Sequence, residues 1–264
     1  MEKEKEIFLS NLSWPKIKNL IEKSTPVIIP VGSNEQHSTH LPVGTDYFLA
    51  LEGAKEIASK INAVISPVIS VGCSDIHRGF SGTISIKTET LAQILYEACE
   101  CLCKQGFKKI VIFNAHAGND VAISIAVQRA KQNLEIDIIG ILIDDIFKSY
   151  PEGYLAKLDV HAGVVETSYM LFTHPDLVDM DKAVKPKITF SPHIENLAKR
   201  LSREPFLIKI IMKLFPRRVE QFSDTGAITL DNPAYATVEI GKIFHDKLTN
   251  DTVAFLKNWI GEEH

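Results

Sequence analysis

A short run of acidic and imidazole side chains follows the first strongly apolar segment of the chain. Glu35, His37 and Asp46 occur within twelve residues, after a Gly-Ser turn that ends the apolar run. Two carboxylates and an imidazole suit a divalent metal ion of hard to borderline character. The residue types and their spacing therefore predict a metal site, and with it the chemistry of a metal-dependent hydrolase.

The spacing of these residues also suggests how each would be used. Glu35 and His37 are two apart, so in extended backbone their side chains project to the same side. Asp46 returns after a Pro-Val-Gly turn, and its two carboxylate oxygens could span two metal ions. His116 follows a second apolar run and could join them. A two-metal site of this kind lowers the pKa of a bridging water and polarises a substrate carbonyl.

A third polar run offers groups that could move a proton to a leaving nitrogen. It contains His161 and Glu166, which are candidates for general acid and base catalysis. The alternatives are a hydrogen-bonded structural histidine and a glutamate that caps a helix start. Further residues could line the substrate pocket, with structural roles as the alternative: His77, Asn114, Gly118 and Asn119.

Apolar segments rich in β-branched residues predict the strands that would carry these motifs. The expected strands are Pro26–Val31, Ala63–Val71, Lys109–Phe113 and Ile136–Ile143. The expected helices are Tyr47–Ile61, Thr88–Gln105, Val121–Gln132, Val164–Phe172 and, as one helix or a broken pair, Pro233–Ile260. This alternation predicts an α/β fold with a mainly parallel sheet. Ligands gather beyond the carboxyl ends of such strands, where the polar runs fall.

The composition is that of an ordinary soluble protein and excludes several functional classes. The chain has 264 residues, of which 45% are hydrophobic and 23% charged, and this length suits a single domain. A net charge of −4 gives no reason to expect a nucleic-acid partner. No apolar run approaches the ~18 residues needed to cross a bilayer. The charged start of the sequence lacks the apolar core of a signal peptide, so we expect a cytoplasmic protein.

One basic segment, residues 182–218, stands apart from this average composition. The segment contains ten lysines and arginines but only two acidic residues, Glu195 and Glu204. It also includes the apolar stretch Pro205–Phe215. Three interpretations are open: a helix packed on the core, a lid or oligomer contact, or a helix lying on a membrane surface.

Several motifs resemble those of the creatininase (creatinine amidohydrolase) family. The run PVGSNEQHSTHLPVGTD resembles the family's hallmark, and the resemblance continues through FSGTISI, FNAHAGND, HAGVVETSYML and HPDLVDMDKAV. A looser match is TGAITLDNPAYATVEIG, over 225–241. The matches follow the family's order from Val27 to Gly241 and cover most of the chain.

The resemblance implies a three-layer α/β/α sandwich with a binuclear metal centre at the strand ends. By position the metal ligands would be Glu35, His37, Asp46 and His116, with Asp46 bridging. His161 matches a histidine implicated in proton transfer. The resemblance further implies two divalent metal ions per chain (zinc, manganese or iron), a small-molecule substrate, and a homo-oligomer, often a hexamer in this family.

Two departures from the family pattern bear on the substrate. Creatininases place an aromatic residue and then a metal-binding glutamate after the motif histidine, where this chain has Ala117 and Gly118. Either Glu166 or water would then complete the second metal site. Lys157 stands where a tryptophan suited to the flat creatinine ring is expected, which argues against creatinine and hints at an anionic substrate.

Branches of the family with the glycine form of this motif include a formamide deformylase and a peptidase, and both cleave an amide C–N bond. We therefore expect hydrolysis of a small cyclic amide or a formamide. The alternatives are a hydrolase acting on a keto-cyclitol or a peptide amide, and a non-catalytic binding protein of the same fold.

Overall fold

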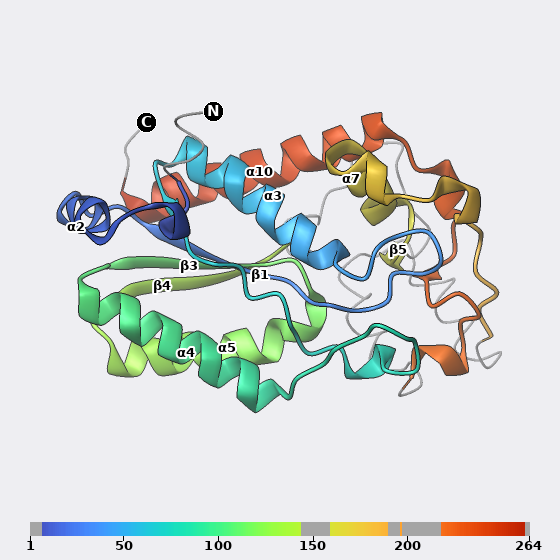
Figure 1. The fold of residues 1–264 in the computed structure, drawn as a ribbon, viewed down its shortest axis with the longest axis horizontal. Helices are drawn as coiled ribbons and strands as arrows, with labels where there is room; N and C mark the ends of the chain where they lie inside the picture. Colours follow the sequence, from blue (N-terminus) through green and yellow to red (C-terminus); the bar gives the residue numbers. More distant parts are fainter. Residues whose placement is uncertain (1–6, 144–158, 190–195, 197–217, 262–264) are drawn as a thin grey trace.

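A four-stranded parallel sheet forms the centre of the protein. The computed structural model describes residues 7–143, 159–189, 196 and 218–261. The strands are β1 (Val27–Val31), β2 (Val64–Ile65), β3 (Lys109–Asn114) and β4 (Asp137–Leu142), in the order β2-β1-β3-β4. A second, antiparallel pair, β5 (Asp159–His161) and β6 (Ile228–Thr229), lies toward the carboxyl ends of β1 and β3, at the right of Figure 1.

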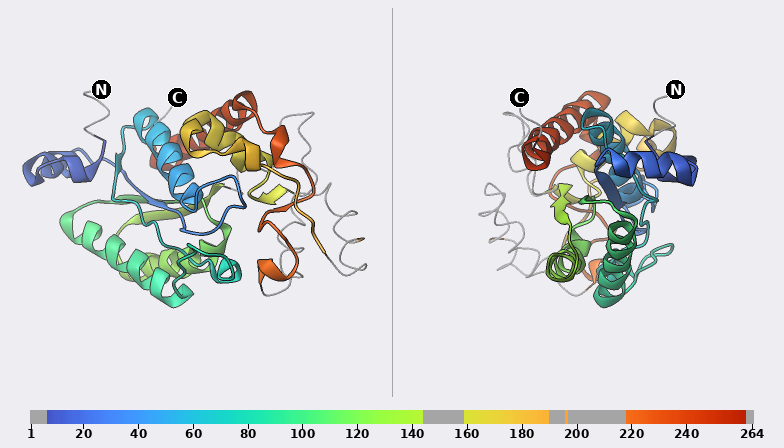
Figure 2. Two further views of the ribbon diagram at one scale, coloured as in Figure 1. Left: turned by 45° about the vertical axis from the view of Figure 1, so that its right-hand side comes forward. Right: turned by 90° about the vertical axis from the view of Figure 1, so that its left-hand side faces the viewer.

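Helices cover both faces of this sheet. One layer consists of α3 (Thr45–Lys60), α7 (Val164–Thr173) and α10 (Val238–Ile260), and the other of α4 (Thr88–Gln105) and α5 (Asp120–Asn133). The end-on view in Figure 2 shows the two layers on opposite sides of the strands. The short helix α2 (Trp14–Glu22) projects at the left of Figure 1, near both termini of the chain.

Alternating strand residues pack against the two helical layers. Ile28, Val111 and Phe113 join the cluster that contains residues of α3 and α10. Their neighbours Ile29 and Ile112 join the cluster that contains residues of α4 and α5. Both faces of the sheet are thus buried, which explains why the strands read as continuous apolar runs. The predicted three-layer α/β fold with a mainly parallel sheet is confirmed.

The predicted strand Ala63–Val71 is wrong in its extent. Only Val64 and Ile65 pair with β1, and a single further bridge joins Ile69 to Val31. Pro67 lies between these two contacts, and a proline has no N–H to donate to a neighbouring strand. The apolar composition predicted a longer strand because burial continues past the proline.

The helix boundaries lie close to the predicted ones, with one difference, at the start of α3, that bears on the site. The segment Thr88–Gln105 is helical over the whole predicted range and ends at Gly106, which has a φ of 112°. Helix α3 begins at Thr45, so Asp46 lies in its first turn and not in the preceding loop. The last predicted element is a broken pair, one of the two expected forms, with the 3-10 turn Pro233–Tyr235 followed by α10.

Two features singled out in the sequence lie outside the described residues. They are Lys157 and most of the basic segment 182–218, including its apolar stretch. Within the described part of the chain, none of the helices combines the length and the apolar character that crossing a membrane requires.

Helices α7 and α10 pack closely because Gly241 has no side chain. A Cβ atom at this position would lie 1.9 Å from the carbonyl oxygen of Ser168 on α7. We expect Gly241→Ala to force the helices apart and to lower the free energy of unfolding by about 1–3 kcal/mol, measured by urea denaturation. The exposed neighbour Lys242→Ala is the control, because it loses only a surface ion pair with Asp246. Equal stability of the two variants would contradict this packing.

Candidate metal centre

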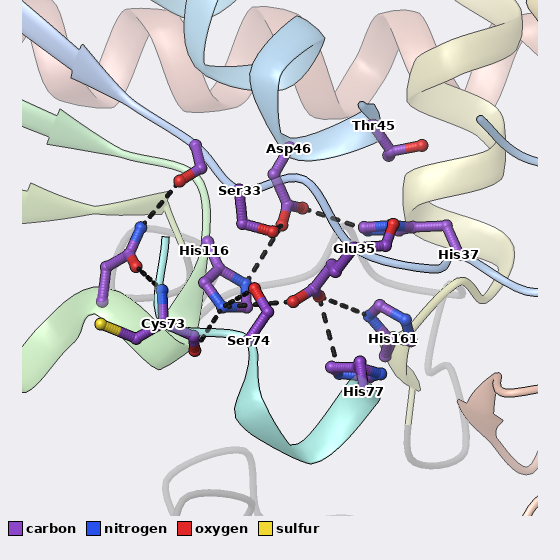
Figure 3. A network of polar contacts seen from close by, with 12 residues as sticks. Ser33, Glu35, His37, Thr45, Asp46, Cys73, Ser74, His77, His116 and His161 are labelled. Carbon is purple, nitrogen blue, oxygen red and sulfur yellow. Dashed lines mark hydrogen bonds and ion pairs between the residues drawn. The ribbon is translucent and has the colours of Figure 1, made fainter. Parts of the chain in front are cut away.

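Acidic and imidazole side chains from several elements converge beyond the carboxyl ends of β1 and β3 (Figure 3). Glu35 and His37 lie in the loop after β1, and Asp46 lies in the first turn of α3. His116 follows β3, and His161 ends β5. These five side chains are at least nine-tenths buried, so the fold gathers a dense set of metal-ligating groups out of contact with solvent.

Asp46 lies between two histidines, one at each carboxylate oxygen. Its Oδ1 is 3.1 Å from His37 Nε2, and its Oδ2 is 3.1 Å from His116 Nδ1. Ser33 also donates a hydrogen bond to Oδ2 at 2.9 Å. Burial alone would raise the pKa of Asp46, but the two histidines hold it well below its usual value. A carboxylate whose two oxygens face different imidazoles has the geometry that a bridging ligand needs.

Glu35 is a buried carboxylate without a hydrogen bond. Its side chain is 0% exposed, and within the described residues neither oxygen has a hydrogen-bond partner. The nearest ring nitrogens are those of His116 at 3.3 Å, His161 at 3.5 Å and His77 at 3.6 Å. Burying a carboxylate that accepts no hydrogen bond is costly unless a positive charge compensates it. Glu35 therefore fits a site built for a bound cation.

Backbone carbonyls orient His37 and His116 so that each presents one ring nitrogen to Asp46. His37 Nδ1 lies 3.1 Å from the carbonyl oxygen of Glu35, and His116 Nε2 lies 3.2 Å from that of Cys73. A carbonyl oxygen can only accept, so these nitrogens carry the hydrogens. The lone pairs of His37 Nε2 and His116 Nδ1 are left for a metal ion, the arrangement usual for metal-binding histidines.

The same two histidines hold protons tightly when no cation is present. Burial disfavours both imidazolium ions, but Asp46 outweighs it at His37 and raises its pKa to about 10. At His116, Glu35 and Asp46 together outweigh burial and raise the pKa to about 9. A divalent ion bound here would replace these protons, because metal ligands must be deprotonated.

Glu166 both accepts a hydrogen bond from the backbone before α7 and faces the site. Its Oε2 accepts a hydrogen bond from the backbone N–H of Ala162 at 2.5 Å and lies 3.8 Å from His37 Nε2. Burial raises the pKa of Glu166 to about 8, although the positive charge of His37 opposes the shift. Ala162 has a φ of 50°, a left-handed conformation that costs free energy in a residue other than glycine. The strained residue Ala162 is thus hydrogen-bonded to the Glu166 carboxylate, which in turn faces His37.

Three overlapping groups of potential ligands result, and in each the ligand atoms lie within 4.8 Å of one another. The groups are Glu35, Asp46 and His116; Glu35, His77 and His161; and His37, His161 and Glu166. The four residues predicted as ligands are thus brought together with both residues predicted as catalytic. Their roles stay predictions, and the chemistry of the donor set fits more than one divalent ion.

His161 and His77 lie against each other at the edge of this cluster. The ring of His161 is 4.3 Å from that of His37 and 4.3 Å from that of His77, between centroids. Burial lowers the pKa of both His77 and His161, and neighbouring histidines lower that of His161 further. Both rings are therefore neutral near pH 7, the form that can accept a proton.

Asn114 and Asn119 use their amide groups to hold the backbone around His116. Asn114 donates to the His116 carbonyl oxygen at 2.8 Å, and Asn119 donates to the Gly32 carbonyl oxygen at 2.9 Å. Asn119 Oδ1 also accepts from the N–H of Cys73 at 2.9 Å. Both asparagines are buried, which supports the structural alternative over contact with substrate.

Gly118 lies where the loop after β3 passes close to the preceding segment. A Cβ atom at this position would be 2.3 Å from the Cys73 carbonyl oxygen and 2.4 Å from His116 Nε2. This backbone leaves no room for a glutamate side chain at 118. Its predicted contact with substrate stays a prediction.

Sequence reasoning did not identify Gln36, which lies between two predicted ligands. Alternation along an extended chain would turn Gln36 away from Glu35 and His37, yet it is buried and contacts both His77 and His161. The backbone turns at Ser38, which has a φ of 63°. The one indication in the sequence was that Gln36 is a polar residue between two predicted metal ligands, Glu35 and His37.

Several known proteins are similar to this chain in sequence. The family model described as creatinine amidohydrolase matches residues 10–256. A creatinine amidohydrolase from Pseudomonas putida is 29% identical over 209 residues, covering 72% of this chain and 80% of that protein. A 3-dehydro-scyllo-inosose hydrolase from Thermotoga maritima is 29% identical over 215 residues, covering 77% and 68%. A mycofactocin precursor peptide peptidase from Mycolicibacterium smegmatis is 29% identical over 258 residues, covering 96% and 92%.

Solved structures share the fold at lower sequence identity. A manganese form of creatininase superposes with a TM-score of 0.77 at 24% identity, covering 96% of this chain and 98% of the other. A putative creatinine amidohydrolase from Bacteroides fragilis has the same TM-score and identity and covers 98% of each chain. At this identity the solved structures show the fold alone, and the three relatives are named for different substrates.

Proposed function

Because the chain belongs to the creatininase family, we propose that it is a metal-dependent hydrolase that cleaves the C–N bond of a small cyclic amide or a formamide. The observation that carries this proposal is the pairing of two buried carboxylates with imidazoles. Glu35 has no hydrogen-bond partner among the described residues, and the two oxygens of Asp46 face different histidines. Such groups are costly to bury unless they hold cations.

We propose that one ion is held by Glu35, Asp46 and His116, and a second by His37, Asp46 and Glu166. Zinc, manganese and iron suit these ligands. Two divalent ions in such a centre supply an acidified water molecule and polarise the substrate carbonyl. His161, which is buried and neutral, is the group that would take a proton and return it to the leaving nitrogen.

Two relatives with other substrates favour specific alternatives. The peptidase aligns with 96% of this chain, so a peptide amide is the first alternative. The inosose hydrolase aligns with 77% and makes a keto-cyclitol the second. Lys157, the residue that hints at an anionic substrate, lies outside the described residues.

A metal-replete screen separates these possibilities. The protein would be incubated with zinc, manganese and ferrous iron in turn, assayed for bound metal, and then tested on lactams, formamides, short peptides and keto-cyclitols, with phosphorylated members of each class. We expect two metal ions per chain and turnover of a cyclic amide or a formamide. Less than about one ion per chain would favour a non-catalytic binding protein, and turnover confined to peptides would favour a peptidase. Sedimentation of the same sample tests the expected homo-oligomer.

Glu166 is the proposed ligand that replaces the glutamate absent at Gly118. Glu166→Gln keeps an oxygen that can accept from the Ala162 N–H but removes the charge. We therefore expect the bound metal to fall from two ions toward one, measured by elemental analysis after dialysis. Glu239→Gln is the matched control, because Glu239 also lies in the first turn of a helix away from the site. Retention of two ions by Glu166→Gln would indicate that water completes the second site.

A further inference from the structure

The side chain of Gln36 has a hydrogen-bond partner for every donor and acceptor it offers. Its Oε1 accepts from the N–H of Ser38 at 2.8 Å. Its Nε2 lies 2.9 Å from the carbonyl oxygen of Gly226 and 2.7 Å from His77 Nδ1. The Ser38 N–H can only donate and the Gly226 carbonyl can only accept, so the orientation of the amide is determined by the backbone.

This orientation sets the tautomer of His77. The Nε2 of Gln36 carries two hydrogens. One is donated to the Gly226 carbonyl, and the other points at His77 Nδ1, which must then be an acceptor. The hydrogen of neutral His77 is therefore on Nε2, 3.6 Å from the carboxylate of Glu35. His77 thus presents an N–H to the site.

The backbone of the same residue sets the same tautomer in His161, whose ring faces the site with its other nitrogen. The carbonyl oxygen of Gln36 lies 2.7 Å from His161 Nε2, and a carbonyl can only accept, so this nitrogen carries the hydrogen. The contact of 3.1 Å between His161 Nε2 and Gln36 Nε2 joins two donors and is not a hydrogen bond. His161 therefore presents the lone pair of Nδ1, 3.5 Å from Glu35.

Gly226 holds the Gln36 carboxamide in this position. It lies far along the chain from Gln36, within the segment 225–241 that matched the family motifs most loosely. Its φ is 89°, and a Cβ atom there would lie 2.0 Å from Gln36 Oε1. A glycine is required both by the backbone conformation and by the space that the carboxamide occupies. The polar cluster after β1 and the segment before β6 are thus joined through one side chain.

We propose that Gln36 is a positioning residue that assigns different roles to the two histidines. His77 is held as a hydrogen-bond donor, and His161 is held with Nδ1 as the nitrogen that exchanges a proton with the substrate. The assignment of that proton to Nδ1 rests on the proposed hydrolase function, whereas the two tautomers do not.

The tautomers are read directly from the ring nitrogen chemical shifts of metal-free protein labelled with 15N-histidine, because protonated and unprotonated ring nitrogens differ strongly. Single variants at His77 and His161 assign the signals. We expect His77 and His161 both to carry their hydrogens on Nε2 in the native protein. In Gln36→Glu, measured at a pH at which the new carboxyl group is ionised, the side chain can only accept, so a hydrogen of His77 should be found on Nδ1. A native His161 protonated on Nδ1, or a His77 tautomer unchanged in Gln36→Glu, would overturn the proposal.

A second pair of variants tests, without changing Gln36, whether Gly226 holds the carboxamide in place. Gly226→Ala should displace the carboxamide and mix the His77 tautomers. Gly261→Ala is the matched control, because Gly261 also has a positive φ, 79°, but no atom within 4 Å of the added Cβ. Thermal unfolding checks that each variant is folded. Native tautomers in a folded Gly226→Ala variant would show that Gly226 is not needed to hold the Gln36 carboxamide in place.

Turnover provides an independent measure once the substrate screen has succeeded. Gln36→Leu should lower kcat by about 10- to 100-fold, the usual effect of losing a group that orients a metal-site residue, with two metal ions retained and KM little changed. Loss of metal in parallel with kcat would instead make Gln36 a structural support of the ligands. Because the tautomers are measured without metal or substrate, failure of the screen would refute the proposed function and leave this test intact.

Discussion

Replacing Asp46 by alanine is expected to strip both metal ions from the protein and to abolish turnover. Each carboxylate oxygen of Asp46 faces a different histidine at 3.1 Å, so in the proposed centre the substitution would remove a ligand from both metal ions. Metal ions contribute several kcal/mol to transition-state stabilisation in hydrolases. At about 1.4 kcal/mol per tenfold change in rate, their loss corresponds to a decrease of about 1,000-fold or more. Elemental analysis and the rate on the substrate found in the screen measure the two effects.

A matched substitution distinguishes the bridge from a general effect on helix α3. Asp120 also lies in the first turn of a helix, α5, but it is exposed. Asp120→Ala should therefore keep two ions and full turnover. Asp46→Asn adds a second test, because it keeps the side-chain shape and only weakens the ligand. Two ions retained by folded Asp46→Ala protein would refute the bridging role.

Replacing His161 by alanine is expected to have the opposite pattern, with metal retained and turnover lost. His161 is not among the four predicted ligands, and its neutral, buried ring faces Glu35 from the edge of the cluster. Loss of a general acid or base usually lowers the rate by about 100- to 10,000-fold. We expect kcat to fall within this range while the protein still binds two ions, measured on the same preparation.

The control for His161 is a histidine outside the cluster. Within the described residues, the ring of His245 forms a hydrogen bond with the hydroxyl group of Tyr169, which lies 2.9 Å from His245 Nδ1. His245→Ala should keep both metal and turnover. Parallel loss of metal and rate in His161→Ala would make His161 a ligand, a role that its position in two of the three ligand groups allows. An unchanged rate would exclude a part in proton transfer.

The sequence determined the layers of the fold because the two central strands, β1 and β3, are apolar on both faces over most of their length. Continuous apolar runs at Val27–Val31 and Ile110–Phe113 can be buried only between two helical layers. Helix ends were also predictable where a single residue stops the helix, as Gly106 does after α4. The strand predicted through Pro67 failed because composition reports burial, whereas a strand also needs N–H donors.

The sequence also identified most of the candidate ligands, because Glu35, His37 and Asp46 are close along the chain and follow a buried strand. The tertiary structure decided how they are arranged. The two histidines at Asp46, the Glu35 carboxylate without a hydrogen bond and the approach of Glu166 to His37 depend on backbone carbonyls and on elements far apart in sequence.

Gln36 illustrates the physical reason for this division. Its side chain meets Gly226, 190 positions further along the chain, and no local pattern reports such a contact. Residue types and their spacing determine which chemistry is available. Which nitrogen carries a proton, and which carboxylate lacks a partner, depends on donors and acceptors that only the folded chain brings within hydrogen-bonding distance.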